Sequence, residues 1–196
     1  MALEDLFHEA LREFLAHEYT LVRKDVHEQS LCGRLAIYLD RAKNRDEALQ
    51  PYFVDVEYNR RGEGRKQILH PVTHEHIDVR CDILLHSRGD LDDDNLIAVE
   101  MKKDDGSAAD KQSDRERLQA LTLPMPEDGN PDYVCGFKLG YYLEVHIGNG
   151  TLLVEEYRGG KMTPLGTAEF ARRSRSDSSS FAKAESRTRK SARRKS

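Results

Sequence analysis

A short continuous apolar run, Leu96-Ile97-Ala98-Val99, ends directly in charged residues and limits the architectures open to this chain. A strand that is apolar on both sides has to be covered on both faces, whereas a strand with one solvent-facing side alternates. The run therefore predicts a central strand in a sheet with helices on each face. Alternation then places the next residue, Glu100, and Lys102 on one face and Met101 on the other.

The remaining elements follow in an order that suits such a sheet. Apolar residues three and four apart predict amphipathic helices from Leu3 to Leu15 and from Lys24 to Ala42, and a mostly polar helix is expected from Ala108 to Thr122. Residues 59–76 are expected to form a polar loop or hairpin tip. Aromatic and β-branched residues predict strands at 52–58, 77–86, 133–139, 141–147 and 151–157. The predicted fold class is α/β, with a central mixed sheet flanked by α-helices.

Charge divides the chain into two unlike parts. Residues 171–196 contain ten Lys or Arg, two acids, eight Ser and one large apolar residue. Such a segment cannot bury enough surface to offset its ordering entropy, so we expect a disordered basic tail. Residues 1–170 hold 21 basic and 33 acidic residues, a net charge of -12, although the whole chain is only at -4. We therefore expect one folded domain over 1–170 and a tail over 171–196.

Several classes of protein are excluded by what the sequence lacks. Cys32, Cys81 and Cys135 stand far apart without a C-x-x-C pair, which fits neither a disulfide framework nor zinc-finger spacing. No apolar run approaches the roughly 18–20 residues that cross a bilayer. The acidic residues that follow Met1 do not suit a signal peptide. We expect a cytoplasmic protein with reduced thiols and no membrane partner.

Asp82 is the first acid expected to join Glu100. It precedes an apolar strand sequence, and a hairpin between this strand and the 96–99 strand would let the two carboxylates meet across the 17 residues that separate them. A carboxylate at the end of a buried strand is costly to desolvate unless it is paired or bound to a metal. Two carboxylates at one place repel each other, and a hard divalent cation with oxygen ligands relieves that repulsion.

Glu28 is expected to supply a third acid from a helix. It lies three, four and seven residues before Leu31, Cys32 and Leu35, on the apolar stripe of the second helix. A glutamate on that stripe points toward the core and away from water. An inward acid facing Asp82 and Glu100 suggests a site.

These residues resemble a known family. Asp82, with Glu100-Met101-Lys102 ending an apolar strand, resembles the metal-binding core of the PD-(D/E)XK nuclease superfamily, and residues 26–39 and 54–60 are similar to an uncharacterised prokaryotic group within it. The resemblance covers roughly residues 25 to 140. It implies a restriction-endonuclease-like core and Mg²⁺-dependent hydrolysis of phosphodiester bonds, with Mn²⁺ able to substitute. One departure is Cys81, where the motif usually has a proline that shapes the chain and does no chemistry.

The resemblance also implies a role for each site residue. Asp82 and Glu100 would bind the metal, Lys102 would position or activate water, and Glu28 would be the helix-borne acid. The same residues also allow structural roles. Glu100 and Lys102 could form an ion pair at a sheet edge, Asp82 could cap a turn, and Glu28 could bridge to Arg80.

The resemblance thus implies a metal-dependent nuclease that acts on nucleic acid, expected to be DNA. A domain with a net charge of -12 repels a polyanion, so the basic tail is expected to bind the phosphates. Lys103, Lys111, Arg115 and Arg117 could add local positive charge near the site. The alternative is a catalytically inactive protein of the same fold that binds nucleic acid or protein through its tail. The basic residues expected to contact nucleic acid are Arg172, Arg173, Arg175, Arg187, Arg189, Lys190, Arg193, Arg194 and Lys195.

Overall fold

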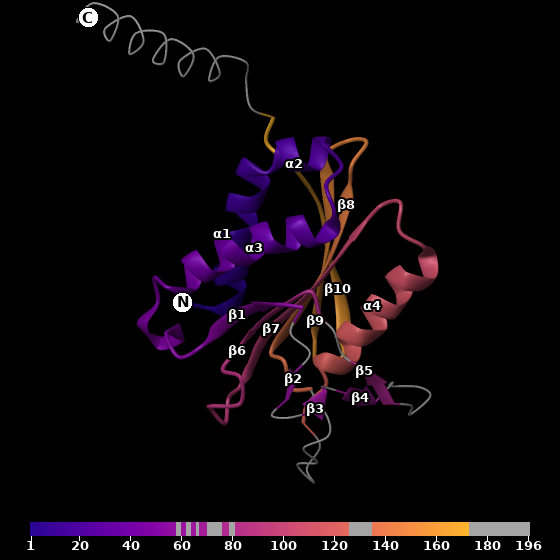
Figure 1. The fold of residues 1–196 in the computed structure, drawn as a ribbon. Helices are drawn as coiled ribbons and strands as arrows, with labels where there is room; N and C mark the ends of the chain where they lie inside the picture. The colour runs from indigo at the N-terminus through magenta and orange to yellow at the C-terminus, as the bar shows by residue number, and fades with distance from the viewer. Residues whose placement is uncertain are drawn as a thin grey trace, which may run out of the picture.

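A six-stranded mixed sheet forms the centre of the protein in a computed structural model (Figure 1). The structure describes residues 1–57, 81–125 and 135–172, together with the backbone of four short strands between residues 60 and 78. The strand order is β1-β6-β7-β8-β9-β10. Strands β7 and β8 are parallel, and the other neighbours are antiparallel. The bounds are β1 (Phe53–Val56), β6 (Ile83–His86), β7 (Asn95–Lys103), β8 (Leu139–His146), β9 (Thr151–Arg158) and β10 (Lys161–Glu169). The predicted α/β class with a mixed sheet is confirmed.

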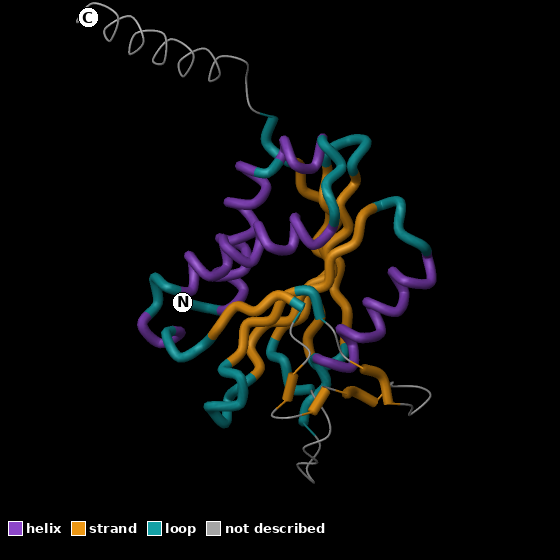
Figure 2. Tube along the Cα trace, in the orientation of Figure 1, coloured by secondary structure: helices purple, strands orange, loops and turns teal. Residues whose placement is uncertain are grey.

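Helices cover both faces of this sheet (Figures 1 and 2). Helices α1 (Leu3–His17), α2 (Tyr19–Arg23) and α3 (Glu28–Lys43) lie on one face and α4 (Ala108–Leu121) lies on the other. Strand β7 contributes Ile97 and Val99 to the apolar cluster under α1 and α3, and Ala98 to the smaller cluster under α4. All three side chains are fully buried, so the prediction of a central strand covered on both faces is confirmed.

The single strand predicted over 77–86 is wrong, because two separate strands occupy this stretch. β5 (His76–Asp78) pairs with β4 (Gln67–Leu69) in a small ladder, and only β6 belongs to the main sheet. A second small ladder joins β2 (Arg60–Arg61) to β3 (Gly64–Arg65), within the stretch predicted as a loop or hairpin tip. The ladder of β6 begins after Asp82 because the Asp82 carboxylate accepts the Met101 N–H, which the next backbone pair would otherwise use.

Other boundaries differ from the prediction for local reasons. The helix predicted from Lys24 begins at Glu28, since Asp25 has a left-handed φ of 53° that separates α2 from α3. The strand predicted over 133–139 is not formed at 135–138, where Gly136 has a φ of 79°; residues 133 and 134 lie outside the described residues. Strand β10 was not predicted. It is an exposed edge strand with Pro164 and a bulge beside Gly166, and it has no alternating apolar pattern.

The folded part of the chain extends slightly past the predicted boundary at 170. The Phe170 ring packs edge-on against Phe14 with 5.4 Å between centroids, and the Ala171 N–H donates to the carbonyl of Leu15 at 2.9 Å. The predicted disorder of the tail, and its basic residues after Arg172, lie outside the described residues. In the part of the chain that is described, no helix is both long and apolar enough to cross a membrane.

Candidate active site

The pairing of β6 with β7 fixes Asp82 beside Glu100. Ile83 pairs with Val99, so Asp82, the residue before Ile83, lies across from Glu100, the residue after Val99. Asp82 Oδ2 accepts the Met101 N–H at 2.8 Å, and the Asp82 carbonyl accepts the N–H of Glu57 at 3.0 Å. The hairpin predicted to bring the two acids together is thus formed, and Asp82 bonds across strands to β7.

The Glu100 carboxylate is buried against helix α4. The residue is 1 % exposed, and its Oε1 accepts a hydrogen bond from Arg117 Nη1 at 2.6 Å. The same Arg117 nitrogen donates to Asp114 Oδ1 at 3.1 Å. Burial raises the pKa of Glu100 well above its usual range. The charges of Asp82 and Asp114 add to this rise, while Arg117 opposes it.

Lys102 connects the two helices that flank the site. Its Nζ lies 3.6 Å from Glu28 Oε2 at the start of α3 and 3.5 Å from Asp114 Oδ2 on α4. Burial lowers the pKa of Lys102, but the carboxylates of Asp114, Glu28 and Asp82 outweigh burial and raise it. Lys102 is therefore an ammonium at neutral pH, able to stabilise negative charge and unable to accept a proton.

Asp82 combines burial with a fixed orientation. Burial raises its pKa, against the lowering effects of the Met101 N–H and the Lys102 charge. Asp114 and Glu28 raise the pKa further. The charges of Lys102, Asp114 and Glu28 act on Asp82, and those of Arg117, Asp82 and Asp114 act on Glu100. Glu28, Asp82, Glu100 and Lys102 therefore share one electrostatic environment, to which α4 adds Asp114 and Arg117. We call these six residues the acidic cluster.

The ion pairs of Lys102 and Glu100 differ from those of the alternative structural roles. The direct ion-pair partners of Lys102 among the described residues are Glu28 and Asp114, and that of Glu100 is Arg117. A sheet-edge pair between Glu100 and Lys102 is therefore not formed. The proposed partner of Glu28, Arg80, lies outside the described residues.

Asp114 is the member of the acidic cluster that the sequence reasoning missed. It is 4 % exposed and lies four and seven residues before Leu118 and Leu121, which are fully buried on the same helix. This is the spacing that identified Glu28, so the same argument could have found Asp114. Of the four basic residues expected near the site, Arg117 joins the cluster. The other three have acidic partners elsewhere: Lys103 with Asp25, Lys111 with Glu144 and Arg115 with Glu155.

The donor set fits a hard divalent cation in its chemistry. Four carboxylates and two cations give the acidic cluster a formal charge of -2 when all are ionised. Within the part of the chain that the structure describes, Glu28 Oε2 and Asp114 Oδ2 are buried and accept no hydrogen bond, although both are within ion-pair distance of Lys102. Among the described residues, no three His, Cys, Asp or Glu side chains are arranged to hold a metal ion. Mg²⁺ is commonly held by one or two carboxylates completed by waters and phosphates, which Asp82 and Glu100 could provide.

Two cysteines, Cys81 and Cys32, lie next to the acidic cluster and have unreactive thiols. Cys81 is fully buried, and its thiol donates to the Val99 carbonyl at 3.2 Å. Burial raises the pKa of both the Cys81 and the Cys32 thiols, and nearby carboxylates raise it further. Neither thiol is a nucleophile at neutral pH, since nucleophilic attack requires the thiolate. Cys32, Cys81 and Cys135, all of which the structure describes, form no disulfide bond.

The metal-free protein is expected to become more stable when Glu100 is replaced by Gln. Because burial raises the pKa of Glu100 in the folded protein, the Glu100 carboxyl loses its proton at a lower pH in the unfolded chain than in the folded protein. Ionisation therefore penalises the folded state as pH rises above about 4.5. Thermal unfolding in EDTA should show E100Q about 2–4 °C above wild type at pH 7.5, the shift that about 1 kcal/mol produces in a chain of this size. The difference should vanish near pH 4.

A variant of the exposed Glu169, E169Q, is the matched control for E100Q and should follow wild type at every pH. A lower melting temperature for E100Q at pH 7.5 would contradict the expectation and make the ionised Glu100–Arg117 pair a stabilising element.

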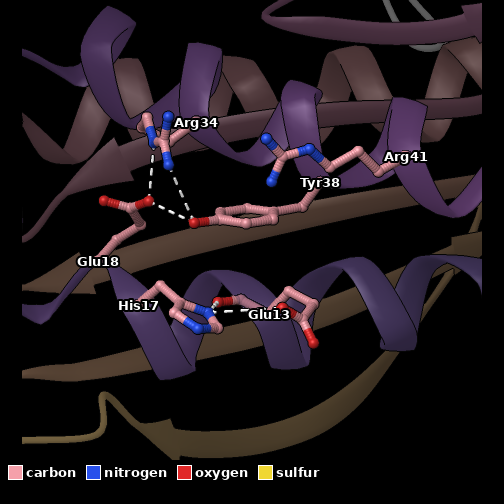
Figure 3. A pocket seen from close by; sticks show the side chains of 6 residues that line it. All are labelled: Glu13, His17, Glu18, Arg34, Tyr38 and Arg41. Atoms are coloured by element: carbon pink, nitrogen blue, oxygen red, sulfur yellow. Dashed lines mark hydrogen bonds and ion pairs between the residues drawn. The ribbon is translucent and has the colours of Figure 1, made fainter.

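A separate polar hollow of about 380 Å³ lies between α1 and α3 (Figure 3). The buried carboxylate of Glu18 accepts hydrogen bonds from Arg34 Nε at 2.7 Å and from the Tyr38 hydroxyl at 2.5 Å. Arg34 and Arg41 lie 5.4 and 5.8 Å from the centroid of the Tyr38 ring. Glu13 and His17 also line the hollow. The hydrogen bonds of Glu18, which precedes α2, link the start of that helix to α3.

Replacing Glu18 by Ala is expected to destabilise the protein by about 1–3 kcal/mol, because it leaves the Tyr38 hydroxyl and the Arg34 guanidinium without their buried acceptor. Urea unfolding followed by circular dichroism measures the change. Glu13→Ala, in the same hollow but half-exposed, should change stability by no more than about 0.5 kcal/mol. Equal effects of the two substitutions would contradict a structural role for the Glu18 network.

No family model matches this chain, and no curated protein or solved structure matches it.

Proposed function

We propose that the protein is a metal-dependent nuclease of the PD-(D/E)XK type that hydrolyses phosphodiester bonds of nucleic acid, with DNA as the expected substrate. One observation carries the proposal: Glu28, Asp82, Glu100 and Lys102, which are far apart in the sequence, interact as one cluster at the junction of α3, β6 and β7. The element order from α3 to β8 supports it, because a helix, antiparallel strands, a helix and a parallel strand suit a restriction-endonuclease-like core.

The roles of the residues follow from their charges. A bound Mg²⁺ would polarise the phosphoryl oxygen and lower the pKa of an attacking water. Asp82 and Glu100 would hold the cation, and the Met101 N–H already orients the Asp82 carboxylate. Lys102 keeps its proton and would stabilise the negative charge that develops on the phosphate. Glu28 and Asp114 hold the Lys102 ammonium from two sides and so position it.

The direct test is a cleavage assay on labelled double-stranded DNA, single-stranded DNA, RNA and supercoiled plasmid. Each substrate is incubated with the full chain in Mg²⁺, Mn²⁺ or EDTA. We expect cleavage with Mg²⁺ or Mn²⁺ and no cleavage in EDTA. Binding without cleavage in any metal would overturn the proposal and favour the catalytically inactive binding protein. A D82N preparation purified in parallel reports any contaminating nuclease.

A further inference from the structure

Arg117 occupies the position from which a cation neutralises Glu100. Its Nη1 lies 2.6 Å from Glu100 Oε1, closer than either ion-pair contact of Lys102. The Arg117 side chain is 17 % exposed and the Glu100 side chain 1 %. A guanidinium held this close to a buried carboxylate forms a strong, charge-assisted hydrogen bond. The guanidinium of Arg117 therefore balances the negative charge of Glu100 without a metal ion.

We propose that Arg117 is a built-in competitor of the metal ion, which a divalent cation has to displace from Glu100 before the site is complete. The inference rests on the proposed function, since it takes Glu100 as a metal ligand. It adds a regulatory element to that site: the strength of the Arg117–Glu100 contact sets the metal concentration at which the site fills.

One observation beyond the 2.6 Å contact supports this role. Asp114 gives Arg117 a second partner, because the same nitrogen contacts Asp114 Oδ1 at 3.1 Å and Asp114 is 4 % exposed. Arg117 can release Glu100 and still remain paired, which lowers the cost of its displacement.

Arg115 provides a matched control on the same helix. It also carries a positive charge, but its partners are Glu155 at 2.9 Å and Glu144 at 3.7 Å, and its guanidinium lies over the Tyr142 ring. Removing Arg115 changes the net charge of the protein as much as removing Arg117 does. A general electrostatic effect would therefore appear in both variants, whereas release of Glu100 would appear only in the Arg117 variant.

The experiment measures Mn²⁺ binding to full-length protein by isothermal titration calorimetry at pH 7.5. We expect Arg117→Met to bind Mn²⁺ about tenfold or more tightly than wild type, and Arg115→Met to bind it within about twofold of wild type. In an E100Q background, Arg117→Met should bring no gain, because the contested ligand is gone. Thermal unfolding gives a second readout: Mn²⁺ should raise the melting temperature of Arg117→Met more than that of wild type.

The outcomes separate the inference from the proposed function. Wild type that binds Mn²⁺, with Arg117→Met binding equally or more weakly, overturns the inference and leaves the nuclease proposal standing. Equal tightening in Arg115→Met overturns it as well. If neither wild type nor Arg117→Met binds Mn²⁺, the metal site itself fails, and the inference fails with it. Circular dichroism checks folding. If Arg117→Met is unfolded, Arg117→Gln, which keeps a hydrogen-bond donor but removes the charge, should still bind Mn²⁺ more tightly than wild type.

Discussion

Asp82→Asn should abolish metal-dependent cleavage, with a loss of about a thousandfold or more in kcat, while the fold is retained. The substitution keeps the size of the side chain and an oxygen for the Met101 N–H, but removes the charge that a metal ligand needs. The carboxylate is already costly to hold in the metal-free protein, since burial raises its pKa. Loss of activity without loss of stability is therefore the expected signature, measured by single-turnover cleavage and thermal unfolding on the same samples.

Asp93→Asn is the matched control for this substitution. Asp93 is an acid in the loop between β6 and β7, its side chain is 63 % exposed, and it pairs with Lys138 away from the acidic cluster. D93N should cleave at the wild-type rate. Activity of D82N within a few-fold of wild type would contradict a ligand role, and a fall in its melting temperature of several degrees would make Asp82 a structural residue.

The part of the site that could be predicted from sequence depended on short-range patterns. The apolar run before Glu100 indicated a covered central strand, and the structure confirms it because Ile97, Ala98 and Val99 are buried on alternate faces. Helical spacing predicted that Glu28 points away from water, and this holds only for its buried Oε2, because the Glu28 side chain is 33 % exposed. Strand and helix periodicity determine the direction of a side chain within a few residues, but not how deeply the side chain is covered.

The rest depended on contacts between distant segments. Which cation neutralises Glu100 is decided by the packing of α4 on β7, where Arg117 contacts Glu100 and Arg115 contacts Glu155. The end of the β6 ladder at Asp82 depends on a side chain that captures the Met101 N–H. Strand β10 owes its existence to backbone pairing with β9, since it lies at an edge and buries little of its own surface.

Removing residues 173–196 should weaken nucleic-acid binding by about a hundredfold or more at low salt, and the loss should shrink as salt rises. The truncation takes away nine basic and two acidic residues and leaves a chain with a net charge of -11. A chain that ends at Arg172 retains the packing of the Phe170 ring against Phe14. It also retains the hydrogen bond from the Ala171 N–H to the Leu15 carbonyl, so the folded part keeps its contacts. Fluorescence anisotropy at several salt concentrations measures both the affinity and the salt slope.

A full-length variant with all nine of these Lys and Arg residues replaced by Gln separates charge from length. If phosphate contacts carry the effect, this variant should match the truncation in affinity and in its flatter salt dependence, because each lost contact removes about 0.9 from the slope. Cleavage at saturating substrate should fall less than binding in both variants, since interactions equal in the bound and transition states change KM and not kcat. Wild-type affinity and slope in both variants would leave the acidic domain to bind a polyanion without the tail, which its net charge opposes.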